Sequence, residues 1–148
     1  MRKPHQLLTS APAWIFTILI LGAILWLTLA PKPLGDEDIP LFPGADKIAH
    51  ALMFGALTGA VLLDWQRKRG WRKVPVGGVW LTAAGASAVG VAVEFAQRSM
   101  HLGRGFEIPD MIADGAGAAL CALAWLFFEP RWLIHEKEKN STHLNSRK

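Results

Sequence analysis

The chain has 148 residues, of which 51% are hydrophobic and 19% are charged, and its mean hydropathy is +0.24. Soluble domains carry about a quarter charged residues, so this composition argues against a soluble globular protein and favours a single membrane domain. The formal net charge of +4 does not indicate nucleic-acid binding, because the lysines and arginines flank the apolar segments, where such residues orient a membrane protein.

Four apolar segments follow one another along the chain, each long enough or nearly long enough to span a bilayer. They cover residues 13–30, 48–63, 74–95 and 111–128. A transmembrane helix needs about 20 residues, so we expect the short second segment to be extended into a helix from Asp46 to Trp65. Its three apolar neighbours argue against a buried helix of a soluble protein. The sequence therefore predicts an all-α fold, an integral membrane four-helix bundle.

The first segment also has the basic residues in front of it that a signal peptide requires, Arg2 and Lys3. Its apolar core is longer than the usual core of about 7–15 residues. In addition, Pro31 directly follows Ala30, the one plausible small-residue cleavage site. We interpret the segment as an uncleaved span.

Basic residues are concentrated before the first span, between the second and third spans, and after the fourth span. These three regions are residues 1–12, 64–73 and 129–148. The positive-inside rule places all three in the cytoplasm, so both termini are cytoplasmic and the loops 31–47 and 96–110 face outward. We predict a cytoplasmic N-terminus over 1–12, a four-span membrane domain over 13–128, and a polar, disordered cytoplasmic tail over 129–148.

Small residues recur at helical spacing within the spans. Gly55 and Gly59 form a GxxxG pair, and Ala113, Gly117 and Cys121 repeat at every fourth position. Helices in lipid associate through close backbone contact at such residues. We expect them to pack the bundle within one chain, with a homodimer through Gly55 and Gly59 as the alternative.

Ionisable and amide side chains gather at the predicted outer ends of the spans. They are Asp46, Lys47, His50, Glu94, Gln97, Arg104, Asp110 and Asp114. Glu94 and Asp114 have no local partner in the sequence, and a buried acid needs one. Asp46 and Asp110 can also act as helix caps. A structural knot of salt bridges that ties three helices together therefore remains an alternative to a ligand-binding or catalytic site.

These residues fall into three motifs that resemble those of the VanZ-like family. The motifs are Asp46-Lys47-Ile48-Ala49-His50 for D-K-x-x-H, Glu94-Phe95-Ala96-Gln97 for E-x-x-Q, and the segment from Arg104 through Asp110 and Asp114 to Gly117 for R-x5-D-x3-N-x2-G. Asp114 stands where the family usually has asparagine. The resemblance covers residues 13–128 and implies a small multi-pass protein of the bacterial cytoplasmic (inner) membrane. The family's named member is associated with low-level resistance to the glycopeptide teicoplanin.

Three classes of function are compatible with this pattern. A binding or accessory protein of the cell envelope would hold a membrane lipid, a lipid-linked cell-wall intermediate or a glycopeptide, with Lys47 and Arg104 on its phosphate or carboxylate. A membrane enzyme acting on an envelope lipid headgroup would use the acids and His50 for acid–base work or for a divalent metal. However, no serine or cysteine nucleophile lies in the motifs and no zinc-type spacing occurs, so we favour binding and expect neither a metal nor a cofactor. A proton-coupled carrier is weaker, because four spans show no inverted repeat.

Overall fold

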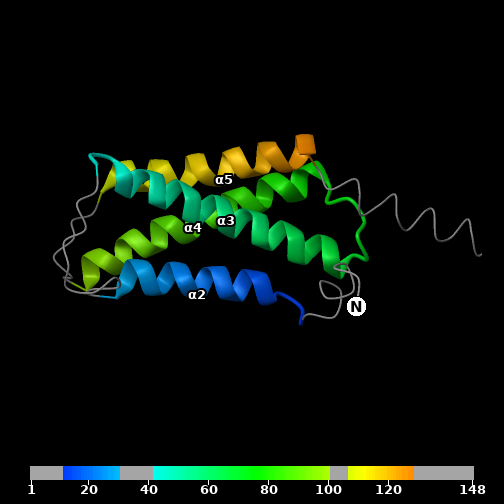
Figure 1. Ribbon diagram of the computed structural model, residues 1–148, viewed down its shortest axis with the longest axis horizontal. Helices are drawn as coiled ribbons and strands as arrows, with labels where there is room; N and C mark the ends of the chain where they lie inside the picture. Colours follow the sequence, from blue (N-terminus) through cyan, green and yellow to red (C-terminus); the bar gives the residue numbers. More distant parts are fainter. Residues whose placement is uncertain (1–11, 31–41, 101–106, 129–148) are drawn as a thin grey trace, which may run out of the picture.

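The computed structural model describes residues 12–30, 42–100 and 107–128. Within these ranges the chain forms four α-helices and no strand (Figure 1). They are α2 (Ile15–Leu29), α3 (Ala45–Lys68), α4 (Val76–Ser99) and α5 (Ile108–Phe128). The all-α prediction and the four helices are confirmed, whereas the predicted N-terminal region up to residue 11 and the tail from residue 129 lie outside the described residues.

Three of the helices, α3, α4 and α5, are long and apolar enough to cross a membrane. The helix α2 is apolar but has only 15 residues, so the first predicted span is shorter than expected. The backbone explains both of its limits. Trp14 adopts a left-handed conformation (φ 63°) just before the helix, and Ala30 is extended (ψ 137°), as steric contact with a following proline requires.

The other helices extend beyond their apolar cores. The helix α3 begins at Ala45, after Gly44 with φ 88°, and continues past Trp65 to Lys68, which confirms the expected extension of the second segment. The helix α4 begins after Pro75 and carries both Glu94 and Gln97 in its last two turns. Pro109 lies in the first turn of α5, where its missing N–H costs nothing.

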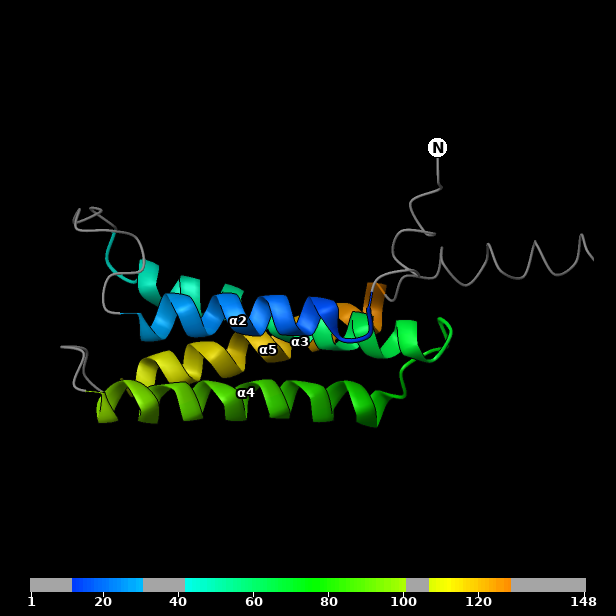
Figure 2. The same cartoon turned by 90° about the horizontal axis from the view of Figure 1, so that it is seen from below.

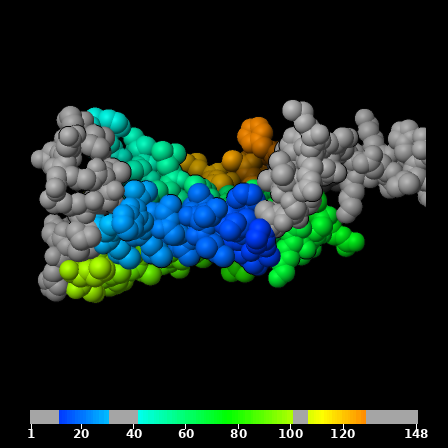
Figure 3. Space-filling view, turned by 60° about the horizontal axis from the view of Figure 1, so that its bottom comes forward, coloured from blue at the N-terminus to red at the C-terminus, as the bar shows by residue number. Residues whose placement is uncertain are grey.

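The four helices lie roughly side by side and alternate in direction along the chain (Figure 1). The ends of α2 and α4 and the beginnings of α3 and α5 therefore meet at one end of the bundle. The helix α5 packs against α3 and α4, and α2 contacts the same two helices; Figure 2 shows α5 between α2 and α4 in projection, and Figure 3 shows α2 lying across the face between α3 and α4. Buried apolar side chains, among them Ile24, Phe54, Leu62, Val79 and Val93, fill the interior.

Small residues allow α3 and α5 to approach each other at backbone distance. A Cβ atom added to Gly55 would lie 3.2 Å from the carbonyl oxygen of Gly117, and one added to Gly117 would collide with the backbone of Ala51. A Cβ at Gly59 would lie 3.4 Å from the Cys121 Sγ. The two glycines of the GxxxG pair thus face α5 of the same chain. The homodimer through them stays a prediction.

Candidate functional site

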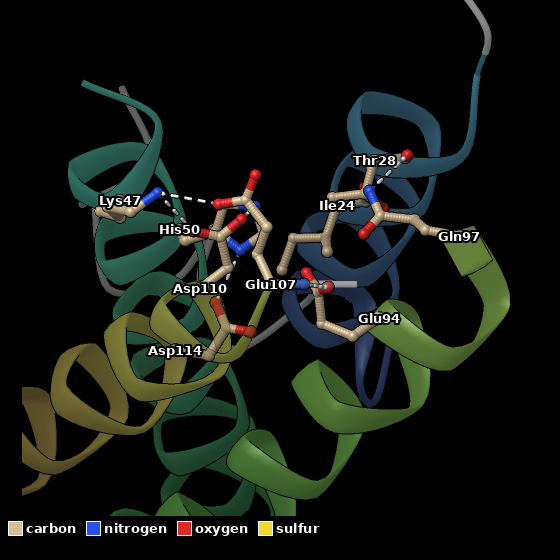
Figure 4. A network of polar contacts seen from close by, with 9 residues as sticks. All are labelled: Ile24, Thr28, Lys47, His50, Glu94, Gln97, Glu107, Asp110 and Asp114. Carbon is tan, nitrogen blue, oxygen red and sulfur yellow. Dashed lines mark hydrogen bonds and ion pairs between the residues drawn. The ribbon is translucent and has the colours of Figure 1, made fainter. Parts of the chain in front are cut away.

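Seven of the eight predicted site residues lie at the same end of the bundle, where α3 and α5 begin and α4 ends (Figure 4 draws most of them). The eighth, Arg104, lies outside the described residues. Contacts add Glu107, which directly precedes α5, to this group. We call the set the polar cluster, and it consists of Asp46, Lys47, His50, Glu94, Gln97, Glu107, Asp110 and Asp114.

His50 and Asp114 form the buried centre of the polar cluster. Their side chains join α3 to α5 through a 2.9 Å contact between Nδ1 of His50 and Oδ1 of Asp114, and the two residues are 3% and 1% exposed. A Cβ atom on Gly90 of α4 would lie 2.9 Å from both Cβ and Cγ of Asp114. The absence of a side chain at Gly90 therefore makes the space that Asp114 occupies.

Lys47 lies at the surface of the cluster and contacts two carboxylates. Its Nζ is 3.1 Å from Oε2 of Glu107 and 3.1 Å from Oδ1 of Asp110, and its side chain is 40% exposed. Glu107 lies within the third motif but was not among the residues predicted for the site. Its position three residues before Asp110, one turn away at the start of α5, was the available signal.

The two acids considered as helix caps lie in the first turns of their helices. The N-cap of α3 is Gly44, without a side-chain hydrogen bond, and Asp46 lies exposed in the first turn. Asp110 lies buried in the first turn of α5 and pairs with Lys47. Asp46 is thus not the N-cap of α3, and the carboxylate of Asp110 is used in an ion pair.

Asp46, His50 and Asp110 form a group whose possible metal-ligand atoms all lie within 4.8 Å of one another. Within it, Nε2 of His50 is 3.9 Å from Oδ2 of Asp110, which is too long for a hydrogen bond. The sequence offered no metal signature here, because the three residues come from two helices that are distant in the chain.

Glu94 and Gln97 connect α4 to the rest of the site. Oε2 of Glu94 accepts a hydrogen bond from the backbone N–H of Glu107 at 3.2 Å, while its Oε1 is buried without a hydrogen-bond partner. Nε2 of Gln97 donates to the carbonyl oxygen of Thr28 in α2 at 2.9 Å. Figure 4 shows the side chain of Ile24 between Gln97 with Thr28 on one side and the group around His50 on the other. The contact of α2 with the polar cluster could not be predicted from the sequence, because it is made by a main-chain carbonyl group, which every residue has.

The polar cluster contains more acids than bases. Among the described residues, five carboxylates are present, and Lys47 and His50 contact three of them, those of Glu107, Asp110 and Asp114. The carboxylates belong to Asp46, Glu94, Glu107, Asp110 and Asp114. Three of them, those of Glu94, Asp110 and Asp114, are buried, and an uncompensated buried charge is costly. Lys47 and His50 both contact carboxylates, as a structural knot of salt bridges requires. However, several carboxylate oxygens of the cluster accept no hydrogen bond from the described residues.

A separate ion pair lies at the opposite end of the bundle and has a structural role. Oδ1 of Asp64 is 2.6 Å from the Arg67 guanidinium, and Oδ2 accepts hydrogen bonds from the backbone N–H and hydroxyl of Thr17 at 2.9 and 3.0 Å. The guanidinium lies 5.0 Å from the centre of the Phe16 ring. These contacts fix the beginning of α2 to the end of α3, which the sequence analysis did not foresee.

The comparisons with known proteins agree with the motifs. A family model described as VanZ/LLP1 matches residues 9–129, which is most of the chain. No curated protein and no solved structure matched the chain in these comparisons.

Proposed function

The chain belongs to the VanZ/LLP1 family and is a multi-pass membrane protein, and from this premise we propose that it binds a cell-envelope lipid or glycopeptide headgroup at its polar cluster. The observation that carries the proposal is the group of acids at one end of the spans: among the described residues, five carboxylates gather there, and Lys47 and His50 contact three of them. In this proposal the protein resides in the bacterial inner membrane as a binding or accessory protein of the envelope.

The distribution of charge supports an outward orientation of the polar cluster. Arg67 and Lys68 lie in the last turn of α3, and Arg69, Arg72 and Lys73 follow in the connection to α4. This connection is at the end of the bundle opposite to the polar cluster (Figure 1). Basic connections remain on the cytoplasmic side, so both termini are cytoplasmic and the polar cluster faces the envelope.

The hydrogen-bonding groups of the polar cluster favour a headgroup that donates hydrogen bonds. Ionised carboxylates only accept hydrogen bonds, and the described lysine, Lys47, already contacts two of them. A headgroup that offers donors, such as sugar hydroxyls or an ammonium group, complements this surface. A phosphate would be repelled by the carboxylates and is within reach of Lys47 only at the exposed edge. Asp46 and Glu107 are the exposed acceptors that such donors reach first.

The test compares glycopeptide susceptibility and direct binding in matched variants. Wild type, Asp46→Asn/Glu107→Gln and a control at the opposite end, Arg69→Gln, are produced in a glycopeptide-sensitive bacterium at equal membrane levels. We expect wild type and the control to lower teicoplanin susceptibility, and the double variant to lose most of this effect. Binding of teicoplanin to the purified proteins in nanodiscs should follow the same order. Equal susceptibility and equal binding for all three proteins would overturn the proposal.

Catalysis on an envelope lipid headgroup is a second candidate, and one observation favours it. The pairing of His50 with Asp114 at 2.9 Å is the arrangement that orients a histidine for general acid–base work. A catalytic protein would change the lipid composition of the membrane in which it is produced. Mass spectrometry of lipids from the same strains separates the two candidates, because a binding protein leaves the set of lipid species unchanged.

A further inference from the structure

We propose that Asp46, His50 and Asp110 bind a divalent transition-metal ion, Zn²⁺ or Mn²⁺, between the beginnings of α3 and α5. This proposal does not require the headgroup proposed above, although the two share Asp46, because it rests on the geometry of three side chains. The ligand atoms are one carboxylate oxygen of Asp46, Nε2 of His50 and Oδ2 of Asp110.

The distances fit an ion at the centre of the three groups. Bonds from Zn²⁺ to nitrogen and oxygen are about 2.0–2.2 Å long, so two ligand atoms of one ion lie about 3.4 Å apart at a tetrahedral angle and up to about 4.2 Å apart when opposite. The observed 3.9 Å between Nε2 of His50 and Oδ2 of Asp110 falls in this interval. All three ligand atoms lie within 4.8 Å of one another, so the carboxylate of Asp46, which is exposed, has to move toward the other two ligands by a fraction of an ångström when the ion binds.

The imidazole of His50 is a second, independent indication of a ligand. The residue is 3% exposed, and its Nε2 has no hydrogen-bond partner among the described residues, although it points at the carboxylate of Asp110. The other ring nitrogen contacts Oδ1 of Asp114 at 2.9 Å. Because an ionised carboxylate only accepts, Nδ1 carries a proton, and in the neutral imidazole that a metal ligand requires the lone pair then lies on Nε2. A histidine held by a carboxylate in this way is the usual support of a metal ligand.

The surrounding charges are compatible with a cation at this place. Lys47 contacts Oδ1 of Asp110, which leaves Oδ2 on the side of His50. The carboxylate of Asp114 lies against the other ring nitrogen of His50. A divalent ion would offset the negative charge of the carboxylates around it.

The ligand atoms, one imidazole nitrogen and two carboxylate oxygens, indicate which metal ions the site can bind. Ca²⁺ and Mg²⁺ prefer oxygen ligands alone, whereas imidazole suits Zn²⁺, and the two carboxylates suit both Zn²⁺ and Mn²⁺. Three protein ligands leave at least one coordination position for water, and the exposed side of Asp46 gives water access to it. The site therefore has the composition of an open metal centre.

The experiment uses the purified full chain in detergent after treatment with a chelator. Zn²⁺ or Mn²⁺ is added, and stoichiometry and affinity are measured by isothermal titration calorimetry. We expect one ion per chain. Loss of a supporting carboxylate typically lowers metal affinity about 10–100-fold, so Asp114→Asn should weaken binding by that factor, and Asp46→Asn and Asp110→Asn by at least as much. Arg69→Gln, at the opposite end of the bundle, should bind the ion like wild type.

A spectroscopic measurement keeps the proposal testable if the buried variants fold poorly. Pulsed electron paramagnetic resonance of Mn²⁺ bound to wild type should show coupling to a ¹⁴N nucleus of His50, and Asp46→Asn, at an exposed position, should still weaken the affinity. Failure of the wild-type chain to bind either ion, binding that Asp46→Asn and Asp110→Asn leave unchanged, or bound Mn²⁺ without ¹⁴N coupling would each overturn the proposal.

Discussion

Replacing Gly90 with alanine is the sharpest test of how the buried centre of the polar cluster is built. The added Cβ would lie 2.9 Å from Cβ and Cγ of Asp114, closer than such atoms approach in real structures. Asp114 is fully enclosed and cannot move outward without losing its 2.9 Å contact with His50. We therefore expect Gly90→Ala to destabilise the protein although alanine favours helices.

The magnitude follows from three contributions. Overpacking a filled interior costs about 1–3 kcal/mol, and losing a buried hydrogen bond to a charged group costs about 1.5–3 kcal/mol. The higher helix propensity of alanine returns about 1 kcal/mol. The net free energy of unfolding should fall by about 2–5 kcal/mol.

The assay is the unfolding of the purified full chain in detergent, with Gly85→Ala as the matched control. Gly85 lies in the same helix, and a Cβ there would meet nothing within 4 Å, so the control should be as stable as wild type or slightly more stable. Equal stability of Gly90→Ala and Gly85→Ala would refute the packing of Asp114 against Gly90.

Three further predictions concern the helix contacts and the topology. Gly117→Ala should prevent the close approach of α3 and α5 and sharply reduce the amount of folded protein in detergent, whereas Gly115→Ala, whose Cβ would meet only a hydroxyl at 3.8 Å, should accumulate normally. Asp64→Asn should weaken the buried hydrogen bond to the Arg67 guanidinium and lower the free energy of unfolding by about 1.5–3 kcal/mol, the usual contribution of a hydrogen bond to a charged group, measured by thermal unfolding; an unchanged stability would mean that the pair does not fix α2 to α3. Thiol labelling of intact cells should modify Asp38→Cys and spare Arg69→Cys, and the reverse pattern would invert the proposed orientation.

The helices and the end of the bundle that carries the polar side chains could be predicted from the sequence. Hydrophobic length and the spacing of charges determine where a helix lies, and both are local properties. For the same reason the extension of α3 beyond its apolar core was foreseen. The helix α2 is shorter than predicted at its N-terminal end because Trp14 adopts a left-handed conformation, which the local sequence does not predict.

The pairing of side chains could not be predicted, because it depends on how the helices pack. Glu107 was seen only as part of a motif, and its contact with Lys47 depends on α3 and α5 lying side by side. The role of Gly90 in accommodating Asp114 requires α4 to lie against the same pair. The contribution of α2, a carbonyl oxygen of Thr28, carries no sequence information at all.

The shortness of α2 has a consequence for the lipid around the protein. Its 15 residues rise about 22 Å, whereas the hydrocarbon core of a bilayer is about 30 Å thick. Such hydrophobic mismatch is relieved by local thinning of the bilayer. Thr28, near the end of α2, lies beside Gln97, so thinning at this helix would bring the headgroup layer down to the level of the polar cluster. If the function proposed above holds, a lipid headgroup would reach these side chains by moving sideways in the membrane plane rather than by leaving it.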